Sequence, residues 1–146
     1  MKPSSMRGIG MVLAAAVLGA CATMDEPSLY KRLGGRDAIA FVVDDFVANM
    51  VADARVSGRF KALKPPEVNR LKSNLSDQIC EAAGGPCSYL GRDMKTAHKG
   101  MMVSEAEWNA TVENLAKALE KRSVAAREKS ELLGALGGMK KDIVGQ

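Results

Sequence analysis

His98 is the only histidine in the chain, and it is the residue best suited to chemistry. A structural zinc site usually needs four protein ligands, and a Ser-His-Asp hydrolase needs a nucleophile and an acid, so a lone histidine favours neither. Iron in a porphyrin needs only one protein ligand on its proximal side, together with an apolar slot for the macrocycle. Met94 and Met102, about one turn to either side, would supply soft apolar contacts. Haem iron is therefore the metal that this histidine suits; a core or surface histidine is the alternative.

The first 20 residues are typical of an export signal. Basic Lys2 and Arg7 precede an apolar run over residues 9–18, which is too short to span a bilayer permanently. Leu18-Gly19-Ala20-Cys21 is similar to a lipobox, in which cleavage occurs before a lipidated cysteine. We therefore expect a signal peptide over residues 1–20 and a lipid on Cys21; ordinary secretion is the alternative.

A lipid on Cys21 determines where the mature chain resides, because its acyl chains would anchor it firmly in a bilayer. Residues 21–27 then form a short tether. We expect the mature chain on the periplasmic side of a membrane, and Ala22, in place of an aspartate after the cysteine, favours the outer membrane.

Cys80 and Cys87 lie on either side of Gly84-Gly85-Pro86. An oxidising compartment permits a disulfide between them. Two separate thiols, with Cys80 packed inside, are the alternative, because a sequence does not show whether the Cα atoms lie within bridging distance.

The composition indicates one helical domain. The chain has 146 residues, of which 47% are hydrophobic, 4% aromatic and 26% charged, with helix-forming residues prominent. Without Lys2 and Arg7, the chain has 19 basic and 17 acidic residues, so it is close to neutral. Because the basic residues are dispersed and no aromatic residues alternate with them, we expect no nucleic-acid binding.

Apolar residues at spacings of three and four predict an all-α fold. The expected helices are 29–33, one from about 36 with Asp44, Asp45 and Asn49 largely on its outer face, one turn near 56–60, one from 65 to 84, a short one from about 93, one capped by Ser104 and Glu107, and one from about 123 through Met139 and Ile143.

Several motifs in this order resemble the group 1 truncated haemoglobins: Gly34-Gly35, Asp45-Phe46, Phe60, Gly84-Gly85-Pro86 and Met94-Lys95-Thr96-Ala97-His98. The resemblance runs from Ser28 to about Val144, so we assign residues 28–146 to one globin domain. It implies a fold of two helices packed over two others, haem b as cofactor, and a proximal segment that is mostly loop.

The resemblance also implies roles for individual residues. His98 corresponds to the proximal iron ligand, Phe60 to the phenylalanine on the haem face, and Val47, Leu71 and Leu75 to the distal wall; Phe46 and Met94 complete the cofactor contacts. Many members have a tyrosine at the place of Val47 and a glutamine near that of Leu75, and both donate hydrogen bonds to oxygen. This chain has neither, unless Gln78 or Asn74 donates in a different helix register.

The function that follows is reversible binding of oxygen, nitric oxide or carbon monoxide. We expect weak oxygen retention and, since a second histidine is absent, five-coordinate ferrous haem. Oxidation of nitric oxide with an external reductase is the enzymatic alternative. A haem-free helical interaction module is the other alternative.

Overall fold

The computed structural model describes residues 26–146, and these residues form helices joined by turns and loops. The helices are α1 (Leu29–Arg32), α2 (Gly35–Ala52), α3 (Pro65–Ala82), α4 (Met94–His98), α5 (Glu105–Lys121) and α6 (Ala126–Gly137), with 3-10 turns η1 (Ser57–Arg59) and η2 (Lys140–Asp142). Residues 26–146 contain no strand, only an isolated bridge between Val103 and Val144. The all-α prediction is confirmed.

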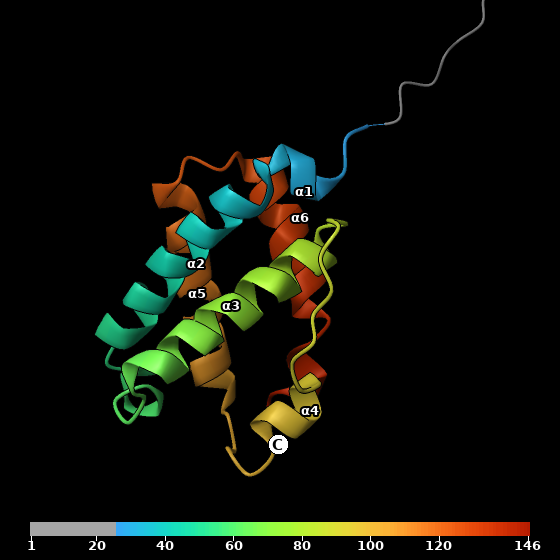
Figure 1. Ribbon diagram of the computed structural model, residues 1–146. Coiled ribbons are helices and arrows are strands. Elements are labelled where there is room, and N and C mark those ends of the chain that lie inside the picture. The colour runs from blue at the N-terminus through green and yellow to red at the C-terminus, as the bar shows by residue number, and fades with distance from the viewer. Residues whose placement is uncertain (1–25) are drawn as a thin grey trace, which may run out of the picture.

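The four long helices form two layers, with α2 and α3 crossing in front of α5 and α6 (Figure 1). α2 packs on both α3 and α5, α3 packs on α6, and α5 packs on α6. The short α1 lies between α2 and α6 at one end, whereas α4 contacts η2 at the other. This arrangement is the expected two-over-two fold.

The apolar face of α2 forms the centre of the core. All six of its predicted core positions are buried, namely Ile39, Val42, Val43, Phe46, Val47 and Met50. The expectation for Asp45 was wrong, because this residue is only 7% exposed. Lys121 Nζ and Arg122 Nε donate to its two carboxylate oxygens, at 2.7 and 2.5 Å. These hydrogen bonds from the end of α5 hold the pKa of Asp45 below its usual range and make its burial tolerable.

Local chemistry explains where the helices begin. Gly34 precedes α2 with φ +94°, a conformation that favours glycine. Pro65 occupies the first turn of α3, where its missing N–H costs nothing. At α5, Ser104 Oγ accepts from Glu107 N at 3.2 Å and Ser104 N donates to Glu107 Oε2 at 2.9 Å, which confirms the predicted capping box.

The last helix is shorter than expected. It begins at Ala126 because Ser123, with φ +57°, interrupts the helical backbone, and it ends at Gly137, before a second glycine at 138. Met139 and Ile143 therefore lie outside α6, in and around the turn η2.

Within residues 26–146, no helix is both long and apolar enough to cross a membrane. The predicted signal peptide over residues 1–20, Cys21 and most of the tether lie outside the described residues.

Candidate haem site

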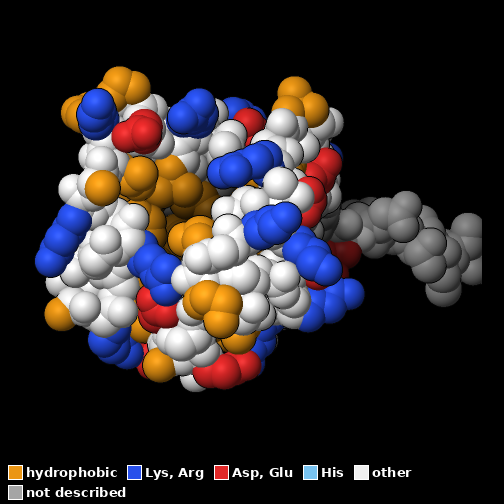
Figure 2. Space-filling view, turned by 90° about the horizontal axis from the view of Figure 1, so that it is seen from below, with side chains coloured by type: hydrophobic (Ala, Val, Ile, Leu, Met, Phe, Trp, Pro, Cys, Tyr) orange, Lys and Arg blue, Asp and Glu red, His pale blue; other side chains and the backbone are white. Residues whose placement is uncertain are grey.

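A hollow with a hydrophobic floor opens at one end of the molecule. Figure 2 looks from below onto the end where, in Figure 1, α4 and the beginnings of α3 and α5 lie. Lysine and arginine side chains lie around its rim. An apolar hollow with a basic rim suits a flat apolar group that carries carboxylates at its edge.

His98 is the last residue of α4, a helix of five residues. Asp93 caps this helix, and its Oδ1 accepts from Thr96 N at 2.9 Å, which lowers the pKa of the Asp93 carboxyl. Gly100, with φ +79°, follows the end of the helix. The cap and the glycine together keep α4 short and place a half-buried histidine at its end.

The imidazole of His98 is oriented by a backbone carbonyl. Its Nδ1 lies 2.8 Å from the carbonyl oxygen of Met94. Because a carbonyl oxygen can only accept, Nδ1 carries the proton in the neutral imidazole and Nε2 keeps the lone pair. Nε2 has no hydrogen-bond partner among residues 26–146. This is the usual arrangement of a metal-ligating histidine, so His98 fits an iron ligand.

The predicted wall on α3 is apolar and only half-buried. The two predicted residues, Leu71 and Leu75, lie four residues apart and neither is fully buried; Val68, three residues before Leu71, is half-buried as well. Phe60, just after η1, is half-buried too, and it packs against the core together with Val68 and Leu75. A haem pocket requires apolar side chains that the protein itself covers only in part, and these residues on one face of α3 fit that requirement.

The predicted contacts on α2 lie deeper. Phe46 is 7% exposed and Val47 is 4% exposed, both as part of the main core. Neither Val47 nor the two predicted leucines of α3 carries a hydrogen-bond donor on its side chain.

The amides near these walls are largely engaged elsewhere. Gln78 Nε2 donates to Met94 Sδ at 3.2 Å, so this amide is turned toward α4, and Met94 itself is half-buried. Asn49 Nδ2 donates to the carbonyl oxygen of Asn114 at 3.1 Å. Asn74 is half-buried and makes no side-chain hydrogen bond to any described residue. In the alternative helix register Gln78 would donate to bound oxygen. In the structure its amide donates to Met94 instead.

Cys80 and Cys87 form a disulfide, with their Cα atoms 5.8 Å apart. The bridge joins the end of α3 to the loop that leads to α4. Gly85 lies in the enclosed turn, where a Cβ atom would approach Cys80 Sγ to 2.6 Å. Of the two alternatives left open by the sequence, the bridge is the one observed. No group of three or more histidine, cysteine or acidic side chains within residues 26–146 is arranged to hold a metal ion.

Sequence reasoning missed an ion pair between η1 and α5. Arg59 Nε and Nη2 donate to Glu107 Oε1 and Oε2 at 2.8 and 3.0 Å, and Arg59 Nη1 donates to the carbonyl oxygen of Met101 at 2.7 Å. The capping-box pattern identified Glu107 only as a helix cap. Its second partner lies 48 residues away, so no local pattern could have indicated it.

Comparisons with known proteins agree with this geometry. Residues 28–144 match the family model described as bacterial-like globin. The chain is 34% identical to a group 1 truncated haemoglobin of Mycolicibacterium paratuberculosis, over 81% of this chain and 85% of the relative. It is 31% identical to a group 1 truncated haemoglobin of Tetrahymena pyriformis, over 84% of this chain and all of the relative.

Solved structures show the same fold. The ferric form of the truncated haemoglobin of Tetrahymena pyriformis superposes with a TM-score of 0.77 at 30% identity, covering 82% of this chain and 100% of that one. The 2/2 haemoglobin of a Synechococcus species, in the cyanomet state with covalently attached haem, gives a TM-score of 0.74 at 27% identity, covering 81% and 98%.

Proposed function

Because this chain belongs to the bacterial-like globin family and, within it, to the group 1 truncated haemoglobins, it is a haem-binding globin, and we propose that His98 ligates its iron. The observation that carries this proposal is the bond between His98 Nδ1 and the Met94 carbonyl, which leaves Nε2 available as a ligand. When bound, haem supplies an iron with one open position, at which oxygen, nitric oxide or carbon monoxide binds reversibly.

The remaining residues hold the cofactor by shape and polarity. Half-buried Phe60 and Met94 would pack against haem, and the buried Phe46 would support them from α2. Leu71 and Leu75 would line the side where the gas binds. The basic side chains around the hollow complement the haem carboxylates (Figure 2).

Replacing the proposed ligand tests the assignment. We expect the parent, reconstituted with haem, to show a Soret band that shifts with carbon monoxide in the ferrous state, and His98→Gly to lose or alter it. External imidazole should restore the band in His98→Gly, because the cavity left by the side chain admits a free ligand. Lys99→Ala is the control, since Lys99 is the exposed neighbour of His98. A parent-like spectrum in His98→Gly would refute the assignment.

We further propose that the protein retains oxygen weakly. The three predicted wall residues Val47, Leu71 and Leu75 are apolar, so none donates to the gas. A net hydrogen bond contributes about 0.5–1.5 kcal/mol and more to a charged acceptor, so the loss of two would speed oxygen release by roughly one to three orders of magnitude. Carbon monoxide gains less from such donors, so its dissociation rate would change little.

Val47→Tyr should reverse this effect. Adding one hydroxyl donor should slow oxygen dissociation by roughly tenfold or more while changing carbon monoxide dissociation little. Val47→Phe adds the same ring without the hydroxyl and is the matched control. Stopped-flow dissociation rates measure both, and an oxygen off-rate in the parent as slow as that of Val47→Tyr would contradict weak retention.

Conversion of nitric oxide to nitrate is the enzymatic candidate. It consumes oxygen and needs electrons from a separate reductase, which the described residues do not include. An apolar wall works against it, because oxygen must stay in place until nitric oxide arrives. Rapid nitrate formation with an electron donor would nevertheless establish it.

We propose that the mature protein is exported and anchored by a lipid on Cys21. The lipobox-like sequence supports this, and so does the disulfide between Cys80 and Cys87, since such bridges persist in oxidising compartments. The parent should fractionate with membranes on the periplasmic side, preferentially the outer one, and incorporate radiolabelled palmitate. Cys21→Ser should remain soluble and unlabelled. A soluble, unlabelled parent would instead support ordinary secretion.

A further inference from the structure

We propose that Arg59 is a positioning residue for haem ligation, which fixes the segment joining His98 to α5. The inference rests on the proposed role of His98 as iron ligand. Residues 99–104 form this segment, and they determine how the end of α4 is held against the rest of the fold.

The contacts of Arg59 make a clasp across the end of the molecule. Its guanidinium donates two bonds to the carboxylate of Glu107, and a third, at 2.7 Å, to the carbonyl oxygen of Met101. The Arg59 side chain is 32% exposed and that of Glu107 is 22% exposed, so water covers the clasp only in part. A planar guanidinium with three charge-assisted bonds has little freedom, so the Met101 carbonyl is held in one place.

The segment needs an external hold because its own backbone is unfavourable. Glycine adopts the φ of +79° found at Gly100 without strain, but Met102 has φ +48°, which is unfavourable for a residue with a side chain. Two bonds to the C-terminal tail restrain one side: Met102 N donates to the Gln146 carbonyl at 2.5 Å, and Gly145 N donates to the Val103 carbonyl at 2.9 Å. Arg59 restrains the other side through its bond to the carbonyl oxygen of Met101, which lies three residues after His98.

The clasp also couples two walls of the haem site. Arg59 directly precedes Phe60, the proposed haem contact, so one residue fixes both the turn η1 and the loop after His98. Glu107 serves as the common anchor, because its carboxylate also accepts from Ser104 N at 2.9 Å at the start of α5. Arg59 and Ser104 together lower the pKa of Glu107 to about 2, so the anchor is ionised at neutral pH.

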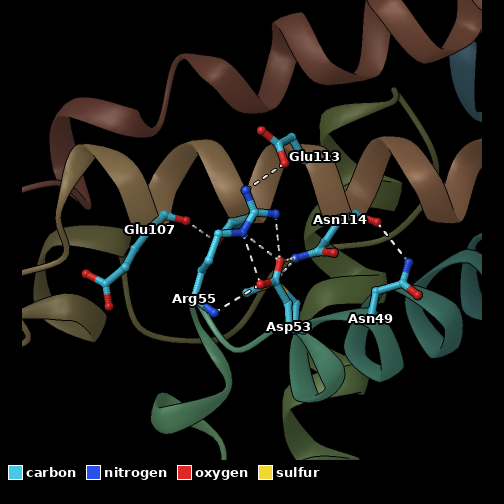
Figure 3. A network of polar contacts seen from close by, with 8 residues as sticks. Asn49, Asp53, Arg55, Glu107, Glu113 and Asn114 are labelled. Carbon is cyan, nitrogen blue, oxygen red and sulfur yellow. Dashed lines mark hydrogen bonds and ion pairs between the residues drawn. The ribbon is translucent and has the colours of Figure 1, made fainter.

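Arg55 offers a matched comparison within the same chain. It also links the loop after α2 to α5, by donating to Asp53 Oδ2 at 2.7 Å and Glu113 Oε2 at 2.8 Å. Figure 3 shows Arg55 between these two carboxylates, whereas the Glu107 carboxylate points away from this network. Arg55 is thus a neighbouring arginine clasp that does not touch residues 99–104.

The test compares Arg59→Gln, Arg59→Lys and Arg55→Gln in the haem-loaded protein. Haem loss is followed by transfer from the ferric protein to excess apomyoglobin, and the iron–histidine stretching band is followed by resonance Raman spectroscopy of the ferrous protein. We expect Arg59→Gln to lose haem roughly three- to tenfold faster and to shift or broaden the band. Arg59→Lys should lie between Arg59→Gln and the parent, because it keeps the charge without the two-pronged geometry.

Arg55→Gln should leave both readouts near parent values, although it lowers stability toward denaturant by a similar amount. Equal haem loss from Arg55→Gln and Arg59→Gln, or an unchanged Raman band in Arg59→Gln, would overturn the proposal and reduce the clasp to general stabilisation. A parent-like spectrum in His98→Gly would instead refute the ligand assignment itself, so the two failures are distinguishable.

Discussion

The two ends of the molecule use the same kind of helical surface in opposite ways. Near Leu33, which follows α1, the side chains of Ile39 of α2, Leu119 of α5 and Leu132 of α6 surround one small internal space and are almost completely buried. On α3, Leu71 and Leu75 are apolar and one turn apart but remain half-buried, and a hydrophobic hollow opens at the end of the molecule that Figure 2 shows.

The difference lies in what covers each face. α1 and α6 close the first end, whereas the second end has only short elements, namely α4 with five residues, the 3-10 turns η1 and η2, and loops. An apolar stripe with no helix of its own to cover it is costly in water. With the proposed haem site, the cofactor would complete the open end, whereas protein side chains already cover the closed end.

The largest expected effect comes from shortening one leucine at each end. Leu132→Ala should lower the free energy of unfolding by roughly 2–5 kcal/mol with or without haem, because it leaves a cavity in a closed core. Leu75→Ala should cost the haem-free protein only roughly 1 kcal/mol, since its side chain is already half-covered. Denaturant unfolding of both forms measures these values.

The informative quantity is the stabilisation that haem adds. It should stay close to the parent value in Leu132→Ala and fall in Leu75→Ala, because binding to the folded state alone raises stability in proportion to the logarithm of affinity. An equal loss of haem stabilisation in both variants would show that the two ends are not independent.

The sequence predicted the closed end better than the open one. Spacings of three and four identified every buried apolar position of α2, and the paired glycines located the end of α1 and the start of α2. The error at Asp45 arose because the two cations that neutralise it come from the far end of α5, 76 and 77 residues away. Periodicity describes one helix at a time and contains no information about distant ion pairs.

At the open end, sequence reasoning could nominate residues but not their geometry. The single histidine and its neighbours indicated the ligand, yet the Met94 carbonyl that orients its ring is visible only in three dimensions. The disulfide beside α1 was left undecided for the same reason, since bridging depends on the distance between two Cα atoms. The Arg59 clasp was missed altogether, because it joins a turn, a loop and a helix that are far apart in the chain.

The next-largest effect concerns the disulfide at the end of α3, which lies beside α1, where Tyr30 N donates to the carbonyl oxygen of Ala83 at 2.8 Å. Replacing Cys80 and Cys87 by serine together should lower the free energy of unfolding by roughly 2 kcal/mol, because the bridge closes a short loop with a sequence separation of 7. The loss should be accompanied by faster haem release, since the bridge holds the loop that leads to α4. Intact mass with and without reductant checks the premise: a parent without a two-dalton increase on reduction has no bridge to remove.

The smallest effect concerns the pH dependence of stability at the open end. The folded-state pKa of Glu107 is about 2, below its ordinary value of 4.5, because Arg59 and Ser104 bind the ionised carboxylate. A lowered pKa contributes stability that is complete above about pH 4.5 and is lost as the pH falls toward 2. In Glu107→Gln this contribution is absent, so its stability should decline less steeply over that window, by about 1 kcal/mol for a partly exposed pair. Glu113→Gln, which removes a partner of Arg55, is the control. Parallel acid-unfolding curves for the parent and Glu107→Gln would mean that the carboxylate is not held in the folded state, and the clasp would then lose its anchor.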